Sequence, residues 1–189
     1  MVRLTCSQCQ RPAGLCYCDS IRPVANSTAV SIIQHPLEQE HPFNTGRIAH
    51  LALNKCKFIV AEQLNANDCQ QVITASSVLL YPDLDWLPPG PPIPDNIDNL
   101  IVLDASWRKS KKMLHLNPAL QALPRLSLSE LGVSNYKVRT TSLPDGLATI
   151  EAIYYALNSL EPEVADDLLL PFQTMVQRQL AMAESQKQS

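Results

Sequence analysis

Glycine is scarce in this sequence, with five residues among 189. None stands at the spacing of a phosphate-binding loop or a dinucleotide-binding fingerprint, so nucleoside triphosphates and NAD are disfavoured as ligands. Long apolar runs are missing too: no stretch approaches the roughly 18 consecutive apolar residues that a membrane span requires. The N-terminus carries Cys, Gln and Arg in place of the apolar segment of a signal peptide. We therefore expect a cytoplasmic protein with no membrane partner.

An overall excess of positive charge is also absent. The net charge of -3 and the pI near 5.8 argue against a protein that binds nucleic acid with its whole surface. The stretch from Asp104 to His115 is an exception, because it holds four cations and one anion and so carries +3 (4 - 1). Its cations are Arg108, Lys109, Lys111 and Lys112. Charge alone does not decide between a phosphate-binding patch and a solvated helix face.

Cysteine is the residue type with the clearest pattern. Four of the six cysteines lie within thirteen positions, namely Cys6, Cys9, Cys16 and Cys18. Two close pairs joined by a short loop can present four thiolates to one tetrahedral ion, the geometry that zinc prefers. Disulfides are the alternative, but they are rare in a reducing compartment. We expect a zinc knuckle over residues 1–24 whose metal is structural, since four sulfur ligands leave no open coordination position.

The rest of the chain, residues 25–189, alternates strand and helix patterns. Strand patterns cover residues 28–34, 57–60, 77–81 and 100–103, with weaker ones at 125–128 and 136–139. Helix patterns cover 44–55 and 68–74 and begin again near 107, 117, 147 and 162, with Pro171 expected to kink or split the last. The proline-rich stretch at 88–94 predicts a loop. This order predicts one α/β domain with a mostly parallel sheet flanked by helices.

Polar residues follow two of the predicted strands. Asp104 ends the apolar run 100–103 and is followed by Ser106 and Trp107, and Gln34 and His35 end the first strand. Ligands bind beyond the carboxyl ends of parallel strands, so Asp104 is a candidate general base beside an indole. Capping and core packing are the alternative roles for these side chains.

The segment after the first strand is rich in His, Pro and carboxylate and leads into a helix. His35, Glu38 and His41 could in principle hold a second metal, but their spacing matches no common ligand pattern. We expect contact with a substrate there, because the N-terminus of the following helix favours an anion. A third polar cluster, residues 140–152, runs into the helix that begins near 147.

Taken in order, these clusters resemble the DTW-domain family, the transfer-RNA uridine aminocarboxypropyltransferases, whose fold is related to the knotted SPOUT methyltransferases. The resemblance rests on the four clustered cysteines with Arg11-Pro12, on Gln34-His35-Pro36-x-Glu38 with Asn44-Thr45-Gly46-Arg47, on Asp104-x-Ser106-Trp107, on Pro124-Arg125-Leu126 and on Thr149-x-Glu151-Ala152. It implies a SPOUT-like fold in which a knot remains an open question.

The resemblance also implies a reaction. S-adenosylmethionine would donate its 3-amino-3-carboxypropyl arm to N3 of a uridine in tRNA, and methylthioadenosine would leave. Asp104 would remove the N3 proton. Residues implied to contact the donor are Ser106, Trp107, Pro124, Arg125, Leu126, Ser127, Leu147, Thr149 and Glu151. Residues expected to contact RNA are Gln34, His35, Glu38, Arg47, Arg108, Lys109, Lys111 and Lys112.

Three alternatives stay open at this point. The first is methyl transfer from the same donor to RNA, and the second is a non-catalytic, zinc-containing RNA-binding module. The third, a zinc hydrolase, needs the unusual His35, Glu38 and His41 set. For the oligomeric state we favour a monomer.

Overall fold

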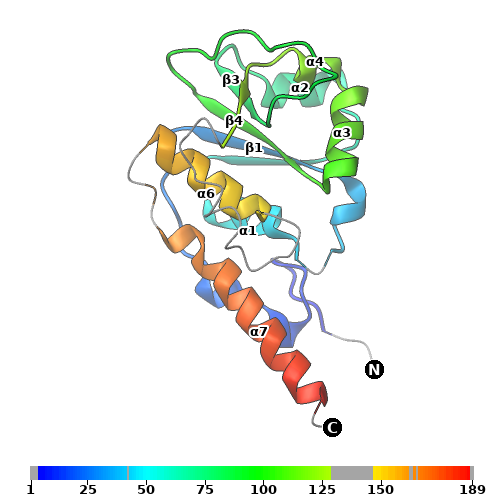
Figure 1. Ribbon diagram of the computed structural model, residues 1–189. Coiled ribbons are helices and arrows are strands. Elements are labelled where there is room, and N and C mark those ends of the chain that lie inside the picture. The colour runs from blue at the N-terminus through cyan, green and yellow to red at the C-terminus, as the bar shows by residue number, and fades with distance from the viewer. Residues whose placement is uncertain (1–3, 42, 129–146, 162–163, 165, 188–189) are drawn as a thin grey trace.

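A computed structural model describes residues 4–41, 43–128, 147–161, 164 and 166–187 (Figure 1). It contains a five-stranded, wholly parallel sheet in the order β2-β1-β4-β3-β5. The strands are β1 (Ala29–Gln34), β2 (Cys56–Val60), β3 (Ser77–Leu80), β4 (Asn99–Asp104) and β5 (Arg125–Leu126). The prediction of an α/β domain with a parallel sheet is confirmed.

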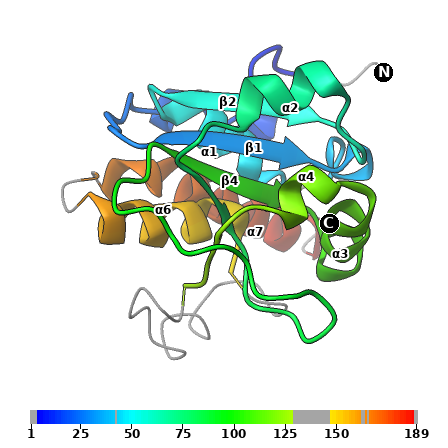
Figure 2. The ribbon, with the colours of Figure 1, turned by 90° about the horizontal axis from the view of Figure 1, so that it is seen from above.

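Helices cover both faces of this sheet (Figures 1 and 2). One face packs against α1 (Thr45–Ala52), α6 (Thr149–Leu160) and α7 (Leu170–Lys187). The other packs against α2 (Ala66–Val72), α3 (Trp107–Leu116) and α4 (Pro118–Gln121). Alternate residues of β4 point into the two cores, and all six are buried, as a central parallel strand requires.

The neighbouring strands β1 and β4 are followed by helices that lie on opposite faces of the sheet. The chain leaves β1 toward α1, whose Ile48 belongs to one core, and leaves β4 toward α3, whose Met113 belongs to the other. The loops after these neighbouring strands therefore diverge, which is the arrangement that opens a ligand crevice at the carboxyl edge of a sheet. Asp104 and Gln34 both lie at this point.

Most predicted elements appear within a few residues of their expected bounds. The first helix ends at Ala52 because Leu53 turns to an extended conformation and pairs with Val24. The second starts at Ala66 because Asn65 and Asp68 form a capping box. The strand expected at 136–139 lies outside the described residues.

The last helical stretch begins later than expected. Val164 is not helical, and a short 3-10 helix, η4 (Asp166–Leu168), precedes α7, which begins at Leu170. Pro171 lies in the first turn of α7, where its missing N–H and fixed φ cost the helix nothing. The split expected at Pro171 is found as the break between η4 and α7, just before this proline. Among the described residues, no helix has the length and apolar character to cross a membrane.

The N-terminal segment folds against α7. It contains two 3-10 turns, η1 (Ala13–Leu15) and η2 (Cys18–Ser20), and an antiparallel bridge between Thr5 and Pro12. Figure 1 shows it in dark blue beside α7, to which it is tied by an ion pair of 2.6 Å between Asp19 and Arg178. Its Tyr17 is buried in the same core as the sheet face.

Candidate active site and metal centre

Asp104 lies at the carboxyl end of β4, directly opposite Gln34 of β1. The residue is 7% exposed, and each of its carboxylate oxygens accepts one hydrogen bond. Gln34 Nε2 donates to Oδ2 at 2.6 Å, and Thr149 Oγ1 donates to Oδ1 at 2.6 Å. Thr149 is the first residue of α6, so three separate elements meet at this carboxylate.

The N-terminus of α1 closes the Oδ2 side of Asp104. Asn44 caps this helix by accepting from the Arg47 N–H, and the same oxygen accepts from Gln34 Nε2 at 2.8 Å. Gly46 lies so close that an added Cβ would be 2.8 Å from the Asp104 Cγ. The absence of a side chain at Gly46 is therefore what lets the helix approach the carboxylate.

The surroundings of Asp104 favour its protonated form. Burial raises its pKa above the ordinary value, and the negative charge of Glu38 acts in the same direction. The hydrogen bonds from Thr149 and Gln34, and the charge of His41, oppose that rise. A carboxylate with a raised pKa is a better proton acceptor than a free one, which suits a general base.

Trp107 begins α3, three residues after Asp104, and is 59% exposed. Its ring meets that of Tyr81 edge to face, with centroids 5.6 Å apart. Tyr81 is itself buried and its hydroxyl lies 2.8 Å from Ser110 Oγ. One side of the indole is thus held in place while the other is open to a flat or apolar ligand. Ser106, the N-cap of α3, is exposed beside it.

The residues expected to contact RNA divide into two groups. Gln34 and His35 are buried, and their polar atoms bond to other protein groups, so they offer RNA little surface. His35 accepts from the Leu37 N–H through Nδ1, which leaves Nε2 to donate to Glu62 at 3.1 Å.

Ion pairs also neutralise half of the basic stretch on α3. Lys109 pairs with Glu38 at 2.7 Å, and Lys112 pairs with Glu62 at 2.8 Å. Arg108 and Lys111 are exposed and have no carboxylate within 4.0 Å in the described part of the chain. These two cations are the ones of this helix that remain available to phosphates.

The first segment expected to hold the donor, 124–127, lies at the edge strand β5. The carbonyls of Pro124 and Leu126 accept from β3 and from Tyr81, so they are part of the sheet. Arg125 is 7% exposed and donates to Asp83 at 3.1 Å and to the Pro88 carbonyl at 2.6 Å. Ser127 follows directly after β5.

The second such segment, 147–151, enters α6 beside Asp104. Leu147 is half-buried just before that helix. Glu151 accepts from the Ala148 N–H at 2.9 Å and so caps α6, while burial raises its pKa. Of the cluster at 140–152, residues 140–146 lie outside the described part. Thr149 is thus the donor-site candidate that directly touches Asp104.

The four clustered cysteines converge on one point. Their sulfurs all lie within 4.8 Å of one another, with 3.7 Å between Cys6 and Cys18 and between Cys9 and Cys16. A tetrahedral ion with metal–sulfur bonds of about 2.3 Å would place its sulfurs roughly 3.8 Å apart. Disulfides would need about 2.05 Å. The arrangement therefore fits a four-thiolate metal site and not a pair of disulfides.

The backbone of this knuckle is adapted to hold thiolates. Gln10 takes a left-handed conformation with φ of 58°, which closes the turn and lets its N–H donate to the Cys6 carbonyl at 2.9 Å. Hydrogen bonds from the backbone of Cys9 and Gln8 lower the pKa of Cys6 to about 6. Burial raises the pKa of Cys9 and Cys18, so without a metal these two favour the thiol form and Cys6 is the thiol most ready to bind a cation.

Sequence patterns did not reveal two features of this site. One is the contact between Gly46 and Asp104, and the other is the buried bridge from Asn44 through Gln34 to Asp104. A glycine close to a capped helix start was a visible sequence signal for the contact between Gly46 and Asp104. The bridge through Gln34 had no such signal, because Gln34 and Asp104 are 70 positions apart.

The family model of the DTW domain matches residues 3–180. The chain belongs to the DTW-domain family. Within this DTW chain, Asp104, Ser106 and Trp107 and the cysteine knuckle all lie inside the matched range.

Two curated proteins are similar to this DTW chain over nearly all of its length. A protein of Drosophila melanogaster named tRNA-uridine aminocarboxypropyltransferase 2 is 29% identical over 204 aligned residues, which cover 99% of this chain and 79% of the fly protein. A protein of Mus musculus with the same name is 26% identical, covering 94% of this chain and 64% of the mouse protein. No solved structure matches the chain.

Proposed function

We propose that this DTW chain is a tRNA-uridine aminocarboxypropyltransferase. The uridine N3 would gain a bond to the 3-amino-3-carboxypropyl carbon of S-adenosylmethionine, the carbon–sulfur bond would break, and methylthioadenosine would leave. The proposal is carried by Asp104 at the carboxyl ends of β1 and β4, in a chain similar along its length to two proteins of that name. A SPOUT-like relation and a knot stay predictions.

Asp104 has a defined task in this reaction. Uracil N3 carries a proton and is a poor nucleophile until that proton is removed, and a carboxylate beside it can accept the proton. Gln34 and Thr149 hold the two carboxylate oxygens in fixed directions. Gln34, expected among the RNA contacts, is in this proposal a positioning residue.

The donor is activated at three carbons attached to its sulfonium, so the protein must select one by orientation. The exposed face of Trp107 is suited to cover the donor's methyl group and to leave the aminocarboxypropyl carbon facing the uridine. Leu147, Thr149 and the 124–127 segment stay the proposed donor site, and the hydrogen bond of Thr149 to Asp104 supports this assignment for Thr149.

We further propose that the ion held by the knuckle is zinc and that it is structural. Four thiolates fill a tetrahedral shell, so the ion stabilises the fold of the segment and leaves no position for a substrate. The separation into a knuckle at 1–24 and a catalytic domain at 25–189, a monomeric state and a cytoplasmic location remain predictions.

Mass spectrometry of nucleosides tests the reaction. The purified protein is incubated with bulk tRNA and with S-adenosylmethionine labelled in its methionine carboxyl carbon. We expect a labelled nucleoside with the mass of uridine plus the aminocarboxypropyl group. A methylated, unlabelled nucleoside would establish the rival methyltransferase reaction. Absence of saturable donor binding by calorimetry would favour a non-catalytic RNA-binding module.

A further inference from the structure

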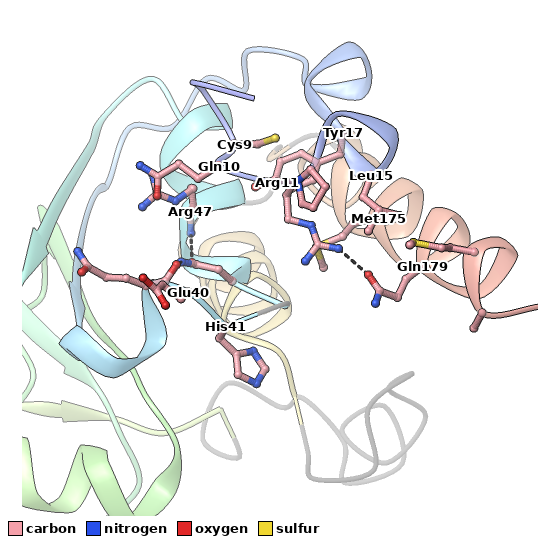
Figure 3. Close-up of a pocket in the computed structure, with 15 residues that line it drawn as sticks. Cys9, Gln10, Arg11, Leu15, Tyr17, Glu40, His41, Arg47, Met175 and Gln179 are labelled. Atoms are coloured by element: carbon pink, nitrogen blue, oxygen red, sulfur yellow. Dashed lines mark hydrogen bonds between the residues drawn. The ribbon is translucent and has the colours of Figure 1, made fainter. Parts of the chain in front are cut away.

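A pocket of about 380 Å³ lies where the knuckle, α1 and α7 meet (Figure 3). One wall comes from the knuckle, from Cys9 onward, and a second from Gln39, Glu40, His41, Asn44 and Arg47 around the start of α1. The third wall comes from α7. The volume is at the lower end of the range of about 300–1,000 Å³ for small-ligand pockets, enough for a phosphate and part of its sugar.

Two arginines face this pocket from different elements. Figure 3 shows Arg11 reaching from the knuckle to Gln179 of α7, to which it donates at 2.5 Å, and Arg47 on α1 beside Gln10. Arg47 also lies over the ring of Phe58, 5.8 Å from its centroid, so its guanidinium is held in place.

Arg47 forms no ion pair with a carboxylate of the described residues. No carboxylate among them is within 4.0 Å of it, and its Nε is buried there without a hydrogen-bond partner. Glu40, the acidic residue among those that line the pocket, is exposed and forms no ion pair with it. A buried guanidinium donor without a partner is costly unless an anion completes it.

We propose that this pocket binds a backbone phosphate of the tRNA substrate, through Arg47 and Arg11. The proposal rests on the proposed function for its RNA. Guanidinium groups match phosphate geometry with two parallel hydrogen bonds, which gives direction as well as affinity. The knuckle would thereby form part of the RNA-binding surface.

The position of the pocket favours RNA over the carboxylate of the donor. Asn44 lines the pocket and bonds to Gln34, which bonds to Oδ2 of Asp104. The segment expected to hold the donor meets Asp104 at its other oxygen, where Thr149 bonds to Oδ1. A phosphate in the pocket would thus be linked to the base through Asn44 and Gln34, and the donor through Thr149.

The test compares Arg47→Gln with Arg22→Gln. Arg22 is an exposed arginine of the N-terminal segment that donates to the local carbonyls of Asp19 and Ile21 and is not among the residues that line the pocket. Its loss changes the net charge by the same amount. Binding of labelled bulk tRNA is measured at several salt concentrations without donor. We expect Arg47→Gln to weaken binding about tenfold and to lower the slope of log K against log salt by about 0.7 to 0.9. Arg22→Gln should stay within twofold.

Two further measurements make the outcome decisive. Arg47→Lys keeps the positive charge but loses the planar guanidinium group. We therefore expect an unchanged salt slope and a smaller loss of tRNA affinity. This variant replaces Arg47→Gln if Arg47→Gln does not fold. Calorimetry with S-adenosylmethionine should give the same donor affinity for all variants. Unchanged tRNA binding, an equal loss in Arg22→Gln, or a loss of donor affinity in Arg47→Gln would each overturn the proposal.

Because binding is measured without turnover, this result is separate from the reaction. If the wild-type protein left RNA unmodified while Arg47→Gln still lost affinity and salt slope, the proposed reaction would fail and the phosphate pocket would stand. If modified nucleoside formed and Arg47→Gln bound tRNA normally, the proposed reaction would stand and the phosphate pocket would fail.

Discussion

At the scale of single residues, Asp104 is held by two hydrogen bonds, one to each of its carboxylate oxygens. A buried carboxylate is costly in its charged form, and the two donors reduce that cost without removing it, because the pKa of Asp104 is still raised. The fold therefore holds a proton acceptor at some expense of stability, as functional sites often do.

The substitution Asp104→Asn tests both the catalytic role of this carboxylate and its cost in stability. We expect turnover to fall by about 10²- to 10⁴-fold, the range that general base catalysis contributes. Because the folded-state pKa of Asp104 is raised, the wild type loses stability as pH rises from the unfolded value of about 3.9 through the folded one. The melting temperature of the variant relative to wild type should therefore increase with pH over that window. Thermal melts and product assays from pH 4 to 8 measure both; near-normal turnover would remove Asp104 as the base.

Gly46→Ala is expected to displace the carboxylate. An alanine in the first turn of a helix normally stabilises it by roughly 0.5–1 kcal/mol relative to glycine, but here the new methyl would meet the Asp104 carboxylate. We expect a lower melting temperature and a large loss of turnover. Gly14→Ala is the matched control, since its added methyl would meet no atom within 4 Å. Equal effects of the two substitutions would contradict the close approach.

At the scale of elements, the knuckle and α7 depend on each other. The buried apolar side chains of the knuckle, such as Tyr17, pack into the core that also holds α7, so the knuckle has no separate core and its order must come from its metal and from these contacts. The 3.7 Å sulfur separations and the left-handed Gln10 show a chain already shaped around one ion.

Cys9→Ser should therefore release the metal and destabilise this end of the molecule. Cys9 is buried and has one of the sulfurs of the four-thiolate site. We expect elemental analysis to find one zinc per wild-type chain and substantially less in Cys9→Ser, with a lower melting temperature. Cys69→Ser, which lies outside the cluster, should keep the zinc content and the melting temperature of the wild type. A full metal content in Cys9→Ser would exclude the four-thiolate site.

At the scale of the whole molecule, one core joins the knuckle to the sheet. Cys9 and Tyr17 pack in the same apolar cluster as Val30, Ile48 and Phe172. A segment that shares its core with the rest of the domain should unfold with it.

Cobalt substitution tests that cooperativity. The cobalt–thiolate absorption reports the knuckle, and far-ultraviolet circular dichroism reports the helices. We expect both signals to be lost at the same urea concentration. Two separate midpoints would show instead that residues 1–24 form an independent unit.

Local patterns in the sequence were enough to predict the cysteine site, the alternation of strands and helices and the parallel sheet. Each depends on residues close together in the chain, such as the spacing of two cysteine pairs or an apolar run. The placement of Asp104 at the sheet edge followed in the same way from the run that precedes it.

The partners of those residues were decided only by the tertiary structure. Gln34 was expected to face RNA and instead bonds to Asp104, because the register of β1 and β4 sets them opposite each other. The pocket joins Arg11, Arg47 and Gln179, which are up to 168 positions apart. No local pattern encodes such contacts, since they arise only when helices pack on a sheet and bring distant segments to one surface.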